Sequence, residues 1–244
     1  MKKAFGIMFI FFVFTGSVQA TELELLKSFF GHSGVSDKKS VYHGEMLTYY
    51  VNKPTLGKSL PKDAKANFRE VFKTQNSAAY AVLLSQGEKT QDWYAFLVRA
   101  NKKWKISAIR TLAIPGLFYL GLKELENKTS RTTEEEWKYQ NMLLTIKRDK
   151  DLKDYLKSHI DEFNKIVSSF KSGNKEASKK MAKKLLIDSV KTENGIYKLL
   201  TGGIMDNSVG FMFIPSDVNQ PIMEPEELIY LENIVSNWYI YKTT

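Results

Sequence analysis

Apolar and polar residues alternate along three neighbouring segments in the first half of the chain. Residues 78–85 form an apolar run, whereas 92–100 and 104–112 carry an apolar side chain at every second position. Short polar segments at 86–88 and 101–102 separate the three. This pattern is typical of an antiparallel meander, and we expect one of its faces to be buried. The apolar sets expected to share a face are Tyr94, Phe96 and Val98 on one strand, and Trp104, Ile106 and Ala108 on the next.

The segments around this meander have a different spacing of apolar residues. Residues 23–30 are rich in leucine and phenylalanine, and 63–73 repeat apolar side chains at steps of three and four, so both are predicted helices. Residues 41–51 fit a strand or a helix. Prolines and a glycine make 53–61 a predicted loop. Residues 117–125 form a short apolar segment, which we expect to be a linker helix or a packed segment.

Helical patterns open the second half of the chain. Thr133 and Glu136 have the spacing of a capping box, so we expect a helix to begin there. Apolar residues recur at steps of three or four over 152–170, which predicts one long amphipathic helix that ends at Gly173. A further helix is expected over 175–190.

The end of the chain returns to strand patterns. Alternation predicts a strand over 209–213, and prolines and carboxylates make 216–225 a loop. Residues 228–235 and 238–242 flank the dipeptide Ser236-Asn237, which indicates a hairpin.

Together these elements predict an α+β fold in two parts. The first, residues 21–125, has N-terminal helices and a curved antiparallel sheet. The second, residues 130–244, has a helical segment followed by a C-terminal antiparallel hairpin region.

The first twenty residues have the layout of a secretory signal peptide. Lys2 and Lys3 precede an apolar run of about 11 residues, and small residues end the segment at Ala20. The run is shorter than the roughly 20 residues that cross a bilayer. We therefore expect cleavage after Ala20, a bacterial periplasmic or secreted protein, and no transmembrane segment in the mature chain.

Composition narrows the chemistry further. The chain contains no cysteine, so we expect neither disulfides nor a lipid anchor at the cleavage site. The net charge is +9, and residues 147–184 concentrate it, with 12 Lys/Arg against 6 Asp/Glu. Such basic helices form either a solvated surface or a docking face for an acidic partner, namely anionic lipid, an acidic protein or a polyanion. Export makes nucleic acid an unexpected partner.

The segment 96–109, with Trp104-Lys105-Ile106 after a polar turn, resembles the NTF2-like (cystatin-like) superfamily. In that superfamily, helices pack in the concavity of a bent antiparallel sheet. The resemblance implies a cone-shaped pocket in the first part, and the family uses this pocket for catalysis, ligand binding or protein binding. The second part resembles no family that we recognise.

Five polar residues are candidates to line such a pocket. We expect them either to bind a ligand there or to have ordinary structural roles. A histidine–aspartate pair could act as a general base in a dry cavity, although tyrosines at core edges and an aspartate at a strand start are equally ordinary. An arginine on an inward face needs a carboxylate or a bound anion. The five are Tyr42, His43, Tyr50, Asp92 and Arg110.

Other motifs of catalysis are missing from the sequence. The three histidines, His32, His43 and His159, are scattered, so we expect no metal site. A glycine-rich phosphate loop and a nucleophile elbow are also absent, and we name no catalytic residue and no cofactor. The carboxylates at Asp206, Asp217, Glu224, Glu226 and Glu227 do not match a calcium loop, which leaves a solvated acidic rim or a docking site for a basic partner.

Our hypothesis from the sequence is an exported, non-enzymatic binding protein that captures an unknown protein or a small ligand. One concrete form is an immunity or inhibitor-type protein. The alternative is an NTF2-like enzyme, a small hydrolase or isomerase, with its pocket in the first part.

Overall fold

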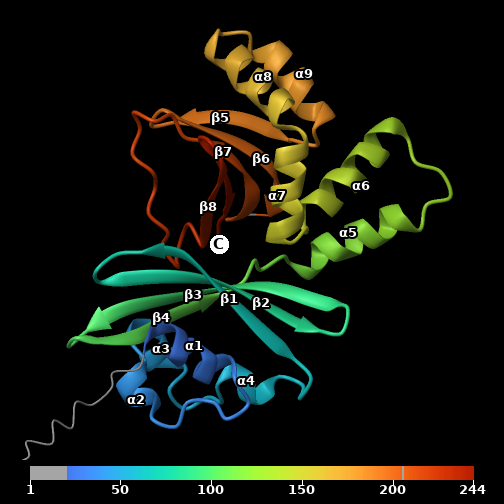
Figure 1. Ribbon diagram of the computed structural model, residues 1–244. Helices are drawn as coiled ribbons and strands as arrows, with labels where there is room; N and C mark the ends of the chain where they lie inside the picture. The colour runs from blue at the N-terminus through green and yellow to red at the C-terminus, as the bar shows by residue number, and fades with distance from the viewer. Residues whose placement is uncertain (1–20, 205) are drawn as a thin grey trace, which may run out of the picture.

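Two antiparallel sheets form the frame of the molecule in the computed structural model, which describes residues 21–204 and 206–244 (Figure 1). The predicted signal peptide lies outside these residues. The N-terminal sheet follows the chain in the order β1-β2-β3-β4, and the C-terminal sheet has the order β5-β6-β7-β9-β8. The strands are β1 (Lys65–Lys73), β2 (Ser77–Gln86), β3 (Lys89–Ala100), β4 (Lys103–Arg110), β5 (Ser189–Glu193), β6 (Ile196–Ile204), β7 (Asn207–Phe213), β8 (Tyr230–Val235) and β9 (Trp238–Lys242).

Helices precede each sheet, which confirms the predicted α+β class. Four short helices cover the outer face of the N-terminal sheet: α1 (Glu22–Phe30), α2 (Lys38–Val41), α3 (Gly44–Tyr49) and α4 (Leu56–Ser59). Five more connect the two sheets: α5 (Gly116–Glu126), α6 (Thr133–Thr145), α7 (Asp149–Ser158), α8 (Ile160–Lys171) and α9 (Lys175–Lys184). Of the helices in the described ranges, none has the length and hydrophobicity that crossing a membrane requires.

Both faces of the N-terminal sheet are buried, not one as the alternation predicted. Tyr80 and Val82 of β2 pack under α1–α4, with Leu26 and Phe30. The neighbouring small residues of the same strand point the other way and join a core with the C-terminal sheet. An unbroken apolar run is the pattern of a strand buried on both sides, as residues 78–85 show.

A bulge in β4 moves one predicted face to the other side of the sheet. Phe96 pairs with Ala108 and Leu97 pairs with Ile106, so Ser107 is the extra residue. Ile106 therefore packs under the N-terminal helices, whereas Ala108 packs toward the C-terminal sheet. The expectation that Trp104, Ile106 and Ala108 share a face is wrong for this reason.

Residues 63–73 were expected to form a helix, but residues 65–73 are strand β1. A second register shift, between Glu70 and Phe72, places Phe68 against α1 and Phe72 against the opposite core. The shift breaks the period of two and leaves apolar residues at steps of three and one. This spacing resembled a helical repeat.

The predicted long helix over 152–170 is two helices, α7 and α8, that meet at His159. Its ring nitrogen Nδ1 lies 2.9 Å from the carbonyl oxygen of Tyr155, and its backbone leaves the helical region. The helix expected over 175–190 ends at Lys184, because Leu186 adopts a positive φ and β5 follows. The N-cap of α6 is Thr132, which forms a capping box with Glu135. Both residues lie one position before the predicted pair, Thr133 and Glu136.

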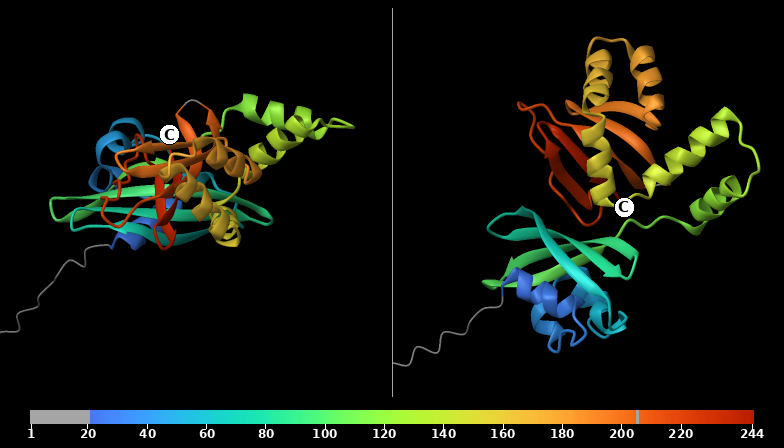
Figure 2. Two further views of the ribbon diagram at one scale, coloured as in Figure 1. Left: turned by 90° about the horizontal axis from the view of Figure 1, so that it is seen from above. Right: turned by 45° about the vertical axis from the view of Figure 1, so that its right-hand side comes forward.

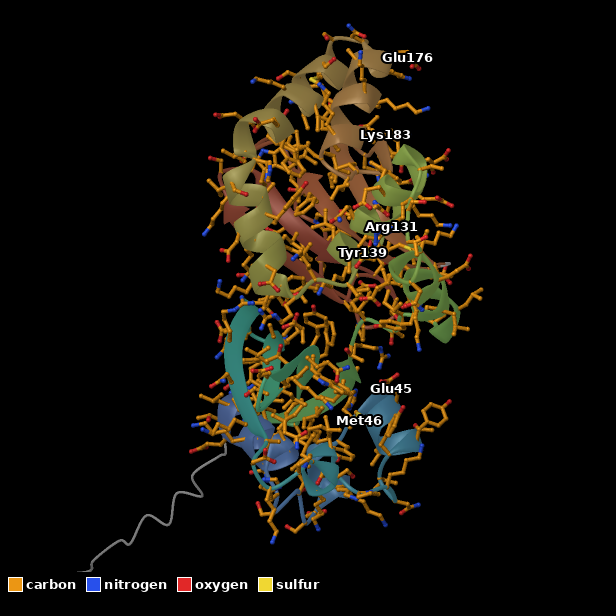
Figure 3. All side chains as sticks on the ribbon, turned by 90° about the vertical axis from the view of Figure 1, so that its right-hand side faces the viewer. Glu45, Met46, Arg131, Tyr139, Glu176 and Lys183 are labelled. Carbon is orange, nitrogen blue, oxygen red and sulfur yellow. The ribbon has the colours of Figure 1, made fainter. Side chains whose placement is uncertain are left out.

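Helices α5 and α6 form an arm that projects from the body (Figures 1 and 2). Phe118 and Leu125 of α5 pack on Met142 of α6 in a small separate core. Arg131 holds the turn between them: its Nε donates to the carbonyl oxygen of Leu125 at 2.9 Å, and its guanidinium lies 4.1 Å from the ring centre of Tyr139 (Figure 3). The segment 117–125 thus packs with the helices that follow it.

Candidate functional site at the junction of the two sheets

A cleft of about 480 Å³ opens where the N-terminal sheet meets the arm and α7. The β2–β3 hairpin, the linker after β4, the start of α5 and the turn between α6 and α7 supply its walls. The C-terminal strand β9 reaches it with its last residue. The lining of the cleft includes Lys89, Asp92, Tyr119, Arg148 and Lys242.

Two residues that line the cleft, Asp92 and Lys242, belong to a buried cluster of charged groups from three elements. Lys242 Nζ of β9 lies 2.7 Å from Asp149 Oδ1 at the start of α7 and 3.8 Å from Asp92 Oδ2 of β3. The backbone N–H of Asp149 donates to Asp92 Oδ2 at 2.8 Å, and the hydroxyl of Tyr94 donates to Asp149 Oδ1 at 2.8 Å. Lys242 is only 2% exposed and Asp149 4%. The cluster therefore joins the two sheets in a nearly dry environment.

Two carboxylates, Asp92 and Asp149, share the ammonium group of Lys242 here, and the excess negative charge affects the pKa of Asp92. Burial and the nearby charge of Asp149 raise the pKa of Asp92, against the opposing effect of Lys242. Burial also raises the pKa of the Tyr94 hydroxyl, so it stays protonated and donates its hydrogen bond.

A second polar group extends this cluster along the junction. The ring of Tyr94 stacks on that of Tyr230 at 4.9 Å, and the Tyr230 hydroxyl donates to Glu232. Glu232 also pairs with Arg69 of β1 and with Lys153 of α7, whose Nζ lies 2.7 Å from Oε1. Burial opposes ionisation of Glu232, but these hydrogen bonds and charges lower its pKa. The pair between Arg69 and Glu232 thus crosses the junction, as the contact between Lys242 and Asp92 does.

Arg110 has the carboxylate partner that the sequence required. Its Nη2 lies 2.7 Å from Glu45 Oε2 of α3, and its Nε donates to the carbonyl oxygen of Pro225 at 2.7 Å. Hydrogen bonding to Glu45 raises the pKa of the guanidinium further. Arg110 therefore ties the N-terminal helices to the loop before β8, and Glu45 marks this edge in Figure 3.

The five predicted site residues do not come together in one pocket. Tyr42 is 1% exposed beneath the N-terminal helices, where burial raises its pKa to about 12. His43 is exposed directly before α3, and Tyr50 is 42% exposed with Lys53 over its ring. Asp92 faces the other side of the sheet. Among the five, the lining of the cleft includes only Asp92.

The sequence reasoning missed Asp149, Lys242 and Tyr94 as one group, although a signal was present for Lys242. Trp238, Ile240 and Lys242 alternate along β9, and the first two are fully buried. Lys242 has the same pattern as Arg110, because each is an inward cation at the end of an apolar strand. Asp149 gave no such signal, because it stands at a helix start, where aspartate is common.

Helix α5, which contributes Tyr119 to the lining of the cleft, also carries exposed apolar side chains. Leu117 and Leu120 are 74% and 67% exposed, and Tyr119, which lines the cleft, is 49% exposed. The two leucines lie one turn apart on the projecting arm. We call Leu117, Tyr119 and Leu120 the arm surface.

Within residues 21–204 and 206–244, histidines and carboxylates do not form a group of three or more that could hold a metal ion. Comparisons of the chain with protein-family models, with curated proteins and with solved structures found no match.

Proposed function

We propose that the protein is an exported, non-enzymatic binding protein of the bacterial envelope, and that it binds a protein partner through the arm surface and the adjoining cleft. An immunity or inhibitor-type protein, which blocks its target by surface complementarity, is the form that this architecture supports best. The observation that carries the proposal is the exposure of two leucines on a projecting helix that borders a cleft.

Exposed apolar side chains on a helix that borders a cleft favour binding. Large apolar residues that gather on a surface mark contact sites more often than scattered ones do. Burying one leucine contributes about 1.5–3 kcal/mol, so the arm surface supplies an anchor of the size found in protein interfaces. Lys89 and Arg148 at the cleft add a polar rim.

The charged cluster at the cleft supports binding over catalysis. Asp149 already accepts hydrogen bonds from Tyr94 and Lys242, and Asp92 accepts one from the backbone of Asp149. These groups hold the two sheets together, and Asp149 and Lys242 are engaged with one another within the protein. A rigid cleft beside an apolar helix face suits recognition of a partner.

The experiment is affinity capture from envelope extract with the mature protein as bait. The double variant Leu117→Ser, Leu120→Ser should lose the partner, because two apolar anchors are removed at exposed positions where folding is little affected. Ile222→Ser is the matched control, since Ile222 is 65% exposed on the loop before β8. Equal capture by the wild type and the double variant would contradict the proposal, as would turnover of a metabolite by a protein that captures nothing.

The second candidate is an NTF2-like enzyme, a small hydrolase or isomerase. It is favoured by one observation: Asp92 lines the cleft and has a raised pKa, as a general base requires. The helices followed by a four-stranded meander support kinship with that superfamily. An activity screen separates the two candidates, because turnover that Asp92→Asn abolishes is expected of the enzyme and not of the binding protein.

A further inference from the structure

Helix α9 carries a dense set of lysines on its outer face. Five of its ten residues are lysine, with Glu176 as its one acidic residue. Ser178 and Ala182 face inward and are buried, whereas all five lysines are exposed. The lysines are Lys175, Lys179, Lys180, Lys183 and Lys184, and we call them the α9 lysines.

The α9 lysines differ from three basic residues at the start of α7 and within it in how their charge is balanced. Arg148, Lys150 and Lys153 each pair with a carboxylate. No ion pair within residues 21–204 and 206–244 involves an α9 lysine. The positive charge of α9 is therefore available to an outside partner.

The position of α9 also fits an outside contact. It lies with α8 at the end of the molecule farthest from α1–α4, and Figure 3 shows Glu176 and Lys183 on this outer part. The cleft at the junction contains no residue of α9, and no large apolar residue of α9 is exposed. The face offers charge without an exposed apolar anchor.

We propose that the α9 lysines dock the protein on an anionic lipid surface. A bilayer with acidic headgroups needs only a dense, accessible set of cations, and each lysine close to such a surface strengthens binding roughly fivefold. A soluble acidic protein would need apolar contacts at the centre of its interface, and α9 exposes no large apolar residue for them. Because α9 has no exposed apolar anchor, the contact is peripheral and depends on charge alone. This inference does not rest on the arm surface.

The test measures binding of the mature protein to vesicles of phosphatidylcholine mixed with phosphatidylglycerol. The triple variant Lys179→Gln, Lys180→Gln, Lys184→Gln should bind about 100-fold more weakly, since three contributions of roughly fivefold are lost. The variant keeps Lys183, which lies over the ring of Trp137. The matched control Lys39→Gln, Lys58→Gln, Lys62→Gln removes the same charge from exposed positions near the N-terminal helices and should bind like the wild type.

Further arms separate a lipid surface from other anions. Binding should vanish in about 1 M salt, where screening acts within about 3 Å, and on pure phosphatidylcholine. Equal loss in the triple and control variants would overturn the proposal, because net charge alone would then explain binding. Binding to soluble polyglutamate as tight as to the vesicles would also overturn it, as would no binding to either. Unchanged thermal unfolding confirms that each variant is folded.

Discussion

At the scale of single residues, the ion pair between Lys242 and Asp149 is the contact on which the junction depends most. Asp149→Asn should lower the free energy of unfolding by about 3–5 kcal/mol, because it leaves a buried ammonium with only Asp92 at 3.8 Å. Urea unfolding at neutral pH measures this. A loss below about 1 kcal/mol would show that the pair contributes no more than a surface salt bridge.

Replacing Asp92 with asparagine should raise the stability at neutral pH, whereas replacing Asp149 lowers it, although both residues belong to the same cluster. Burial and Asp149 raise the pKa of Asp92 above its ordinary value of 3.8, so the folded protein holds this proton more tightly than the unfolded chain. The stabilisation from its protonation is complete below pH 3.8 and is lost as pH rises through the folded pKa. Asp92→Asn should therefore remove a destabilising charge at neutral pH.

The measurement is the difference in unfolding free energy between Asp92→Asn and the wild type from acidic to neutral pH. The difference should become more favourable to the variant as pH rises above 3.8 and then level off. A trend in the other direction would mean that Lys242 stabilises the ionised carboxylate more than burial and Asp149 oppose it.

At the scale of elements, the sequence predicted strands and helices wherever the hydrophobic period was regular. The strands around residues 78–100 were predicted on this basis, whereas a capping box predicted the start of α6 and a turn dipeptide predicted the hairpin at 236–237. The bulges at Ser107 and between Glu70 and Phe72 each shift the period by one residue. The bulge between Glu70 and Phe72 is the reason that β1 was predicted to be a helix. Local spacing cannot reveal a bulge, because the partner strand decides which residue is left unpaired.

The cap of α6 tests the register of an element directly. Thr132→Ala should lower stability by about 1 kcal/mol, because its hydroxyl accepts from the backbone N–H of Glu135 at 3.2 Å. Thr133→Ala, one residue later, should have an effect within about 0.5 kcal/mol. Thermal unfolding of the two variants decides between them. A larger loss at Thr133 would support the register expected from the sequence.

At the scale of the whole molecule, one core joins both sheets. Tyr94 and Phe96 of the N-terminal sheet pack with Leu152, Phe211 and Tyr230 of the C-terminal half. The sequence could divide the chain into two parts but could not reveal that they share a core. It could name Asp92 as a site residue, but the cluster that defines the cleft comes from three distant segments.

The shared core predicts that both sheets unfold together. Hydrogen exchange measured by mass spectrometry at increasing urea should expose peptides from β2–β3 and β6–β7 in a single step. Two well-separated steps would mean that the halves are independent domains held by surface contacts.

The export of the protein is also a property of the whole chain. N-terminal sequencing of the protein from envelope fractions should begin at Thr21, because cleavage is expected after Ala20. If the protein kept its first 20 residues and stayed in the cytoplasm, the proposal that it acts in the bacterial envelope would be contradicted.

The most direct test of the account is the dissociation constant between the mature protein and the envelope protein that it captures. The variant Leu117→Ser, Leu120→Ser should weaken binding by about 100-fold or more, since each buried leucine contributes about 1.5–3 kcal/mol. Ile222→Ser should leave the constant unchanged. Equal affinity of the wild type and the double variant would contradict the claim that the arm surface binds the partner.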